Sequence, residues 1–185
     1  ETELGQAFKN VDGYNPQDPY SVSKVEAEVG LKLIGESHGM EIVIIRPPLI
    51  YGQGVKGNFA ILLKLASLSV PLPFGAIKNR RSLVSVENLV DLICTCLDHP
   101  NAKNQTFLVS DDCDMSTPQL CNLLAKTGGY NSCIFWFPGS LFRLGLSLIG
   151  KKAVYKRLFG SMEVDIDFTK SHLNWKPPFK VKDSI

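Results

Sequence analysis

The sequence predicts an α/β fold built on parallel strands, and two helix-to-strand transitions carry that prediction. An amphipathic run at 20–38 leads directly into the apolar, β-branched stretch 41–46. Such a stretch is typical of a strand buried on both faces of a parallel sheet. A second helical run, 87–97, precedes a second buried stretch at 105–110. A helix that runs straight into a buried strand is half of a βαβ unit, so both transitions indicate the same architecture.

The composition describes an ordinary globular chain. It has 185 residues, of which 44% are apolar and 21% are charged, and this favours one domain or a large part of one. The net charge is +2 and no basic stripe with interleaved aromatic residues occurs, so we expect no nucleic-acid partner. Five cysteines without a CxxC pair favour a reduced, cytoplasmic compartment and no zinc site.

The segment 1–19 is polar and turn-rich, and we expect a surface loop that leads into the first helix. The chain starts without methionine or a signal peptide, so we expect a piece of a longer protein. The helix 20–38 carries apolar residues on more than one stripe, which predicts burial on two faces, and Gly39 ends it as a C-terminal cap.

Tyr20 and Lys24 stand at the start of this helix. Four residues apart, they lie on one helical face about one turn from each other. A cation there favours the ionised phenol, so Tyr20 is a candidate general acid/base. The alternative is a solvated Tyr beside a solvated Lys, because such a pair arises by chance in roughly two chains of five.

A proline-rich loop at 46–54 follows the strand 41–46. In open α/β sheets, ligands bind outside the carboxyl ends of the strands, and this loop lies at such an end. A glycine-rich phosphate loop does not accompany it, because Gly52 and Gly54 do not open a helix in the required spacing.

The middle of the chain alternates helices, turns and strands. We expect Asn58 to cap a helix at 59–67, a stiff extended segment at 71–75 and a short strand at 82–86. Three basic residues precede that strand: Lys78, Arg80 and Arg81. Because adjacent residues of an extended chain point to opposite faces, at most one of the two arginines is expected to reach a diphosphate. A solvated basic turn is the alternative.

Three carboxylates, those of Asp111, Asp112 and Asp114, follow the strand 105–110. They could hold Ca²⁺, but a later bidentate Glu is missing and turn-forming Asp residues are commoner, so no metal site is expected. A helix with an early proline then runs from Thr117 to Lys126.

The last third predicts a strand at 133–137, helices at 140–149, 153–159 and 165–173, and a short helix from Val181. The stretch 132–150 is nearly uncharged, but Pro138, Gly139 and Arg143 interrupt it, so it is too broken to span a membrane. Membrane contact is therefore not expected, with an interfacial helix as the alternative.

Several motifs, in this order, resemble the extended short-chain dehydrogenase/reductase family, within it the UDP-glucose 4-epimerase-like nucleotide-sugar epimerases and 4-keto reductases. Residues 19–24 resemble the catalytic PYxxSK, residues 46–52 the RPxxVYG segment, and residues 81–86 the RxxVxV strand. Residues 165–177 resemble the closing segment that ends in LGWxP. The resemblance covers nearly the whole chain.

The resemblance implies an incomplete Rossmann-like fold that lacks the N-terminal cofactor-binding strands, with a smaller substrate-binding subdomain. The whole chain, 1–185, would be the C-terminal portion of such an enzyme. Segments 1–50 and 82–110 would belong to the Rossmann-like core, and segments 51–81 and 111–185 mostly to the substrate-binding part.

The resemblance also assigns roles. Tyr20 would be the catalytic acid/base and Lys24 would hold the nicotinamide ribose of NAD or NADP and lower the pKa of Tyr20, with Pro47 and Pro48 bordering the nicotinamide. The UDP-sugar would contact Leu49 (where relatives often have Asn), Asn58, Phe74 and Arg81. Ser85 and Asn88 replace the His and Asp often seen in relatives.

The implied reaction is hydride transfer at C4 of a UDP-hexose, as in a 4-epimerase. The alternatives are a 4-keto reductase that makes a UDP-6-deoxy-amino sugar for surface polysaccharide, and a non-catalytic UDP-sugar-binding relative. The resemblance further implies a homodimer, and a chain that is inactive without the missing cofactor-binding part.

Overall fold

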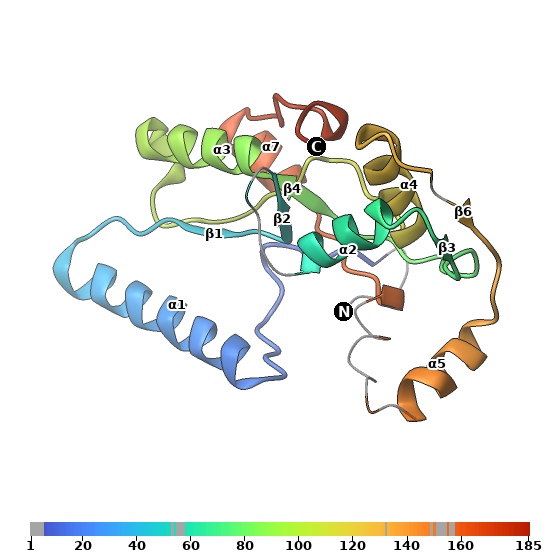
Figure 1. Cartoon of the computed structure of the whole chain (residues 1–185). Coiled ribbons are helices and arrows are strands. Elements are labelled where there is room, and N and C mark those ends of the chain that lie inside the picture. The colour runs from blue at the N-terminus through green and yellow to red at the C-terminus, as the bar shows by residue number, and fades with distance from the viewer. Residues whose placement is uncertain are drawn as a thin grey trace.

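In a computed structural model, the structure describes residues 6–52, 54, 58–131, 133–148, 150, 155 and 158–185. It confirms the α/β prediction (Figure 1). Six strands form three parallel pairs among these residues: β1 (Ile44–Arg46) with β5 (Thr106–Leu108), β2 (Leu49–Tyr51) with β4 (Leu83–Ser85), and β3 (Pro71–Leu72) with β6 (Cys133–Ile134). Parallel pairing aligns the carboxyl ends of each pair at one edge.

The strands are shorter than the patterns predict, and one strand was not predicted. Of the strand predicted at 41–46, only residues 44–46 form β1, in which Ile45 lies opposite Phe107. The loop 46–54 contains β2, so the prolines interrupt the extended chain only briefly. The strand predicted at 133–137 ends at Ile134.

Helix α1 (Pro19–His38) has well-formed ends. The side chain of Asp18 accepts the amide of Ser21 at 2.7 Å in a capping box, and Gly39 closes the helix with a φ of +66°. The predicted burial on two faces is wrong for the structure as described, because Gly35 is the one buried residue of α1. A Cβ at Gly35 would lie 2.7 Å from Ile42, so this glycine allows the helix to pack against the chain that returns to β1.

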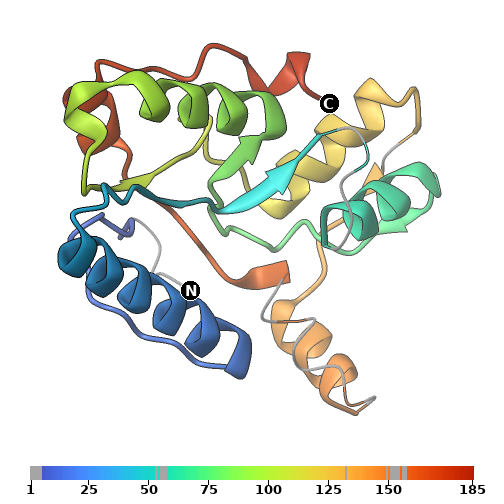
Figure 2. The same ribbon diagram turned by 90° about the vertical axis from the view of Figure 1, so that its left-hand side faces the viewer.

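The main core lies on the side of β1 and β5 that faces away from α1 (Figure 2). Helix α3 (Val86–Asp98), the 3₁₀ turn η1 (Pro100–Ala102) and helix α7 (Asp167–Leu173) surround Phe107, Val84 and Trp175. Helices α2 (Asn58–Ser67) and α4 (Thr117–Thr127) form a second core with Tyr51 and Leu83, which the 3₁₀ turn η2 (Val181–Asp183) completes.

Helix α5 (Gly139–Leu148) projects from the body, beside a third core around Leu72, Phe74 and Cys121 (Figure 1). The helix predicted at 153–159 lies mostly outside the described residues. Within the described part of the chain, no helix is both long enough and apolar enough to cross a membrane.

Candidate active site

Tyr20 and Lys24 lie together on the first turns of α1. The Lys24 ammonium nitrogen is 5.5 Å from the centroid of the Tyr20 ring, within the range of a cation–π contact. Tyr20 is 72% exposed, so its hydroxyl is open to a ligand. The structure therefore brings together the two residues that the PYxxSK motif singles out, on a surface that a substrate can approach.

Glu28 holds α1 in place against the carboxyl end of β1. Its carboxylate accepts two hydrogen bonds from the Arg46 guanidinium, at 2.7 and 3.0 Å, and one each from Lys32 (2.9 Å) and Tyr14 (2.7 Å). The Arg46 guanidinium also lies 5.0 Å from the centroid of the Tyr14 ring. A bidentate Arg–carboxylate pair fixes orientation as well as distance, so this cluster sets the position of α1 and with it Tyr20.

Burial raises the pKa of Glu28, but the hydrogen bonds from Arg46, Lys32 and Tyr14 outweigh burial and lower the pKa to about 2. Sequence reasoning missed this cluster. The i,i+4 spacing of Glu28 and Lys32 was a usable signal, but the partner Arg46 is 18 residues from Glu28 and nothing in the local pattern joins them.

A hollow of about 180 Å³ lies at the carboxyl ends of β1 and β5, where the sequence predicts a ligand. Pro47 is exposed beside it and Pro48 is buried. It is lined by Phe8, Lys9, Asp12, Gly13, Arg46, Pro47, Leu108, Met162 and Val164. The hollow thus shares Arg46 with the cluster that positions α1.

A larger hollow, about 430 Å³, opens at the opposite end of α1. It is lined by residues near Gly39 and Met40 and contains none of the motif residues. Tyr20 and Lys24 line neither hollow, but the smaller one includes Pro47 and shares Arg46 with the cluster that positions α1, so we place the candidate site there.

The predicted substrate-side residues lie in different surroundings. Leu49 is half-buried and pairs with Leu83 in register across β2 and β4. Phe74 is only 3% exposed and meets the Phe142 ring edge-on at 6.2 Å, so its side chain lies in the third core. Asn58 begins α2, and its side chain lies outside the described residues.

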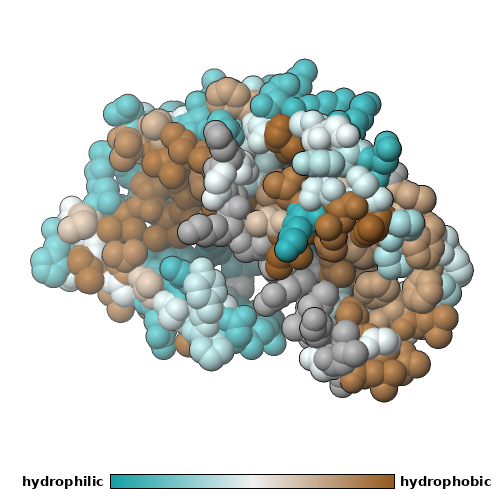
Figure 3. All heavy atoms as spheres, viewed as in Figure 1, coloured by the Kyte–Doolittle hydropathy of each residue, from teal (hydrophilic) through white to brown (hydrophobic). Residues whose placement is uncertain are grey.

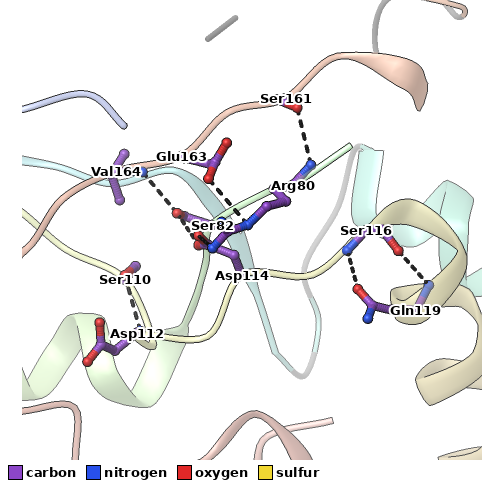
Figure 4. A network of polar contacts seen from close by, with 10 residues as sticks. All are labelled: Arg80, Ser82, Ser110, Asp112, Asp114, Ser116, Gln119, Ser161, Glu163 and Val164. Atoms are coloured by element: carbon purple, nitrogen blue, oxygen red, sulfur yellow. Dashed lines mark hydrogen bonds and ion pairs between the residues drawn. The ribbon is translucent and has the colours of Figure 1, made fainter. Parts of the chain in front are cut away.

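The two adjacent arginines have different environments, and Figure 4 shows that of Arg80. Arg80 pairs with Asp114 at 3.0 Å and with Glu163 at 3.3 Å, and Ser82 donates to the same Asp114 at 2.6 Å. Arg81 is half-buried, and its backbone bridges Met115 on one side and Met162 on the other. Arg80 therefore belongs to a network within the protein, and Arg81 stays the arginine for which the resemblance predicts a diphosphate contact.

The three acidic residues after β5 have different partners. Asp111 is buried and accepts hydrogen bonds from the Tyr51 hydroxyl (2.5 Å), the Asn88 amide group (2.6 Å) and the Ser85 backbone (3.0 Å). Asp112 instead pairs with Lys170, and Asp114 with Arg80. Among the described residues no group of three or more metal-ligating side chains converges.

The residues present fit a nicotinamide cofactor in part. Tyr20 and Lys24 offer an exposed hydroxyl and ammonium on one face, and Pro47 offers an apolar edge by the hollow. These are the groups that would hold a ribose and a nicotinamide ring. A glycine-rich pyrophosphate loop is not among the residues of this chain.

Known proteins resemble this chain in sequence and in fold. The chain is 48% identical over 185 residues to a UDP-glucose 4-epimerase of Vibrio cholerae, covering all of this chain and 56% of that protein. The chain spans about half the length, or less, of the curated relatives that it matches. The fold is similar to that of a UDP-glucose 4-epimerase from Thermotoga maritima (TM-score 0.72, 19% identity, 100% of this chain and 56% of that one).

A UDP-glucuronic acid 4-epimerase from Bacillus cereus, solved with NAD, is similar in fold as well (TM-score 0.73, 18% identity, 98% of this chain and 54% of that one). The sequence matches the NAD dependent epimerase/dehydratase family over residues 4–110, more than half of its length. The chain therefore belongs to the NAD dependent epimerase/dehydratase family.

Proposed function

We propose that the full-length protein is an NAD-dependent 4-epimerase of a UDP-hexose, and that Tyr20 is its acid/base. The observation that carries this proposal is the exposed Tyr20–Lys24 pair, held by the Glu28–Arg46 cluster beside the hollow at the carboxyl ends of β1 and β5. The 48% identity to the Vibrio cholerae UDP-glucose 4-epimerase supports the substrate class.

In this proposal Tyr20 removes the proton of the sugar 4-hydroxyl and later returns it. Its exposed hydroxyl can reach a bound sugar, whereas a buried one could not. The Lys24 ammonium stabilises negative charge on the phenol oxygen and donates to the cofactor ribose. When bound, the nicotinamide supplies the hydride acceptor for sugar C4. Pro47 and Pro48 limit where the ring lies.

Leu49, Asn58, Phe74 and Arg81 are the proposed contacts of the UDP-sugar. Arg81 suits the diphosphate because a guanidinium donates in a fork that matches phosphate oxygens. Phe74, packed in the third core, would contribute by shaping the wall behind the uracil. Leu49 offers no polar atom, so the sugar hydroxyls near it need donors from elsewhere.

We also propose a cytoplasmic homodimer that pairs through α1. The exposed Val22, Val29 and Leu33 share one face of α1 and support this, because an apolar helical face of that kind is unusual on a monomer. Sedimentation of the full-length protein as a monomer at all concentrations would remove the dimer from the account.

The test of function is turnover of UDP-glucose by the full-length protein. An epimerase interconverts UDP-glucose and UDP-galactose with no net change in NADH. A 4-keto reductase instead consumes NADPH stoichiometrically when given a 4-keto-6-deoxy UDP-sugar, and a non-catalytic relative binds UDP-sugars and does neither. Either of the last two results would replace the proposal.

A further inference from the structure

Helix α5 has two apolar faces, and only one of them is packed. Phe142, on the inner face, meets Phe74, Phe137 and Phe159 at ring-centroid distances of 6.2, 6.4 and 5.5 Å. Leu141, Leu144 and Leu148 follow one another at helical spacing on the outer face, and all three are exposed. The helix is therefore anchored on one side and presents a row of leucines on the other.

The exposed apolar surface extends beyond the helix. Phe135 and Trp136, in the segment that leads into α5, are exposed too. Figure 3 shows hydrophobic residues gathered over α5, at the lower right of the molecule. Leucine, phenylalanine and tryptophan together form the apolar side of helices that lie in a membrane interface.

The sequence that contains α5 carries charge of one sign. Residues 115–162 contain no Asp or Glu and six basic residues: Lys126, Arg143, Lys151, Lys152, Lys156 and Arg157. This segment thus carries +6 in a chain whose net charge is +2, so the rest of the chain carries −4. Such a concentration is matched by an anionic surface.

Helix α3 provides the contrast. Its exposed Val90, Ile93 and Leu97 also form an apolar face, but the residues of α3 include Glu87, Asp91 and Asp98 and no base. An anionic bilayer would repel that face and attract the one on α5. The sign of the surrounding charge therefore separates two otherwise similar surfaces.

We propose that the outer face of α5, with Phe135 and Trp136, docks on the surface of an anionic phospholipid bilayer. The leucines and Trp136 enter the headgroup boundary, and the positive charge of the sequence 115–162 attracts the anionic lipid phosphates. This differs from the expectation drawn from the sequence, because the pattern alone did not reveal that α5 leaves a whole apolar face uncovered. The proposal needs no substrate, so it stands or falls independently of the proposed epimerase activity.

Vesicle flotation tests the proposal with the full-length protein. We expect it to float with vesicles of equal parts phosphatidylcholine and phosphatidylglycerol, not with phosphatidylcholine alone, and to be released by high salt. The double variant Leu144→Asp/Leu148→Asp should bind the anionic vesicles at least about tenfold more weakly, since it removes apolar area and adds repelled charge.

The matched control is Val90→Asp/Leu97→Asp on α3, whose residues are 50% and 78% exposed, against 57% and 79% for Leu144 and Leu148. The control should bind as the wild type does. Circular dichroism verifies that both variants are folded, and should either fail, Trp136→Phe gives a second readout. Anionic vesicles should shift the wild-type tryptophan emission to the blue, and this substitution should abolish the shift.

Three results would overturn the proposal. The first is no flotation with anionic vesicles, and the second is equal weakening by the α5 and α3 variants. The third is a change of oligomeric state in Leu144→Asp/Leu148→Asp without vesicles, which would make this face a contact between copies of the protein.

Discussion

Tyr20 and Tyr51 show how two identical side chains in neighbouring motifs take opposite roles. Tyr20 is 72% exposed at the start of α1, beside the Lys24 ammonium. Tyr51 is 0% exposed at the end of β2 and donates to Asp111 at 2.5 Å. A phenol that meets solvent can exchange its proton with a ligand, whereas a phenol locked to a buried carboxylate cannot.

The surroundings of Tyr51 reinforce that difference. Burial and the hydrogen bond to Asp111 raise the pKa of Tyr51, so it stays a donor throughout the range in which proteins are folded. Asp111 in turn joins β2 to β4 and α3 through Ser85 and Asn88. This region supports the fold, whereas the proposed chemistry lies in the Tyr20 region. The predictions below test that division, from the largest expected effect to the smallest.

Asp111→Ala should reduce the free energy of unfolding by about 3–5 kcal/mol, because three buried donors lose their acceptor at once. Urea unfolding followed by circular dichroism measures the loss. The neighbouring Asp112→Asn is the control, since Asp112 is exposed, pairs with Lys170 at the surface and has a φ of +57° that Asn tolerates. Equal losses of unfolding free energy in the two variants would show that the buried network stabilises the fold no more than the surface ion pair does.

Glu28→Gln should lower the free energy of unfolding by about 2–3 kcal/mol, because Arg46 and Lys32 lose their charged acceptor. The pKa of Glu28 is lower in the folded protein (about 2) than its ordinary value of 4.5. The folded state therefore binds fewer protons, so the stabilisation is complete above pH 4.5 and is lost as the pH falls toward 2. Unfolding midpoints measured across that window should fall less steeply in Glu28→Gln, and parallel curves would contradict the cluster.

Tyr51→Phe should lower the free energy of unfolding by about 1–2 kcal/mol, because one donor to Asp111 is removed while Ser85 and Asn88 remain. Chemical unfolding gives the value. A loss as large as that of Asp111→Ala would mean that Tyr51 alone holds the network together.

Lys103→Met should change the free energy of unfolding by about 0.5 kcal/mol or less. Its 2.6 Å contact with Glu41 joins two exposed side chains, and such pairs are screened by water. The same thermal or chemical unfolding assay applies. A loss comparable to that of Glu28→Gln would show that exposure does not separate these two ion pairs.

The helices with clear signals were predictable from the sequence. Asp18, Pro19 and Gly39 frame α1 within one residue of the expected range, and Ser116 with Pro118 does the same for α4. These signals are local, since each cap acts on the backbone within a few residues. The strands 44–46 and 106–108 follow for a similar reason, because apolar, β-branched runs suit a parallel sheet. The predicted burial of the first strand on both faces is not seen, since all three residues of β1 are half-buried.

Long-range contacts were not predictable. The sequence near Glu28 gives no signal that Arg46 is its partner. In the sequence Asp111 looks like its neighbours Asp112 and Asp114, and only the fold shows that it is buried against Tyr51. The ion pairs of Arg80 with Asp114 and Glu163 likewise join segments that are far apart in the sequence. The sequence could indicate Tyr20 and Lys24 because one helical turn joins them, whereas the supporting residues come from distant segments.

The central claim is that Tyr20 is the acid/base and Tyr51 is structural. It is tested most directly by comparing UDP-glucose turnover, per folded molecule, in Tyr20→Phe and Tyr51→Phe variants of the full-length protein. We predict that Tyr20→Phe lowers kcat by about 10²–10⁴-fold with unchanged stability, while Tyr51→Phe keeps kcat within about threefold of the wild type. Near-normal turnover in Tyr20→Phe would contradict the account.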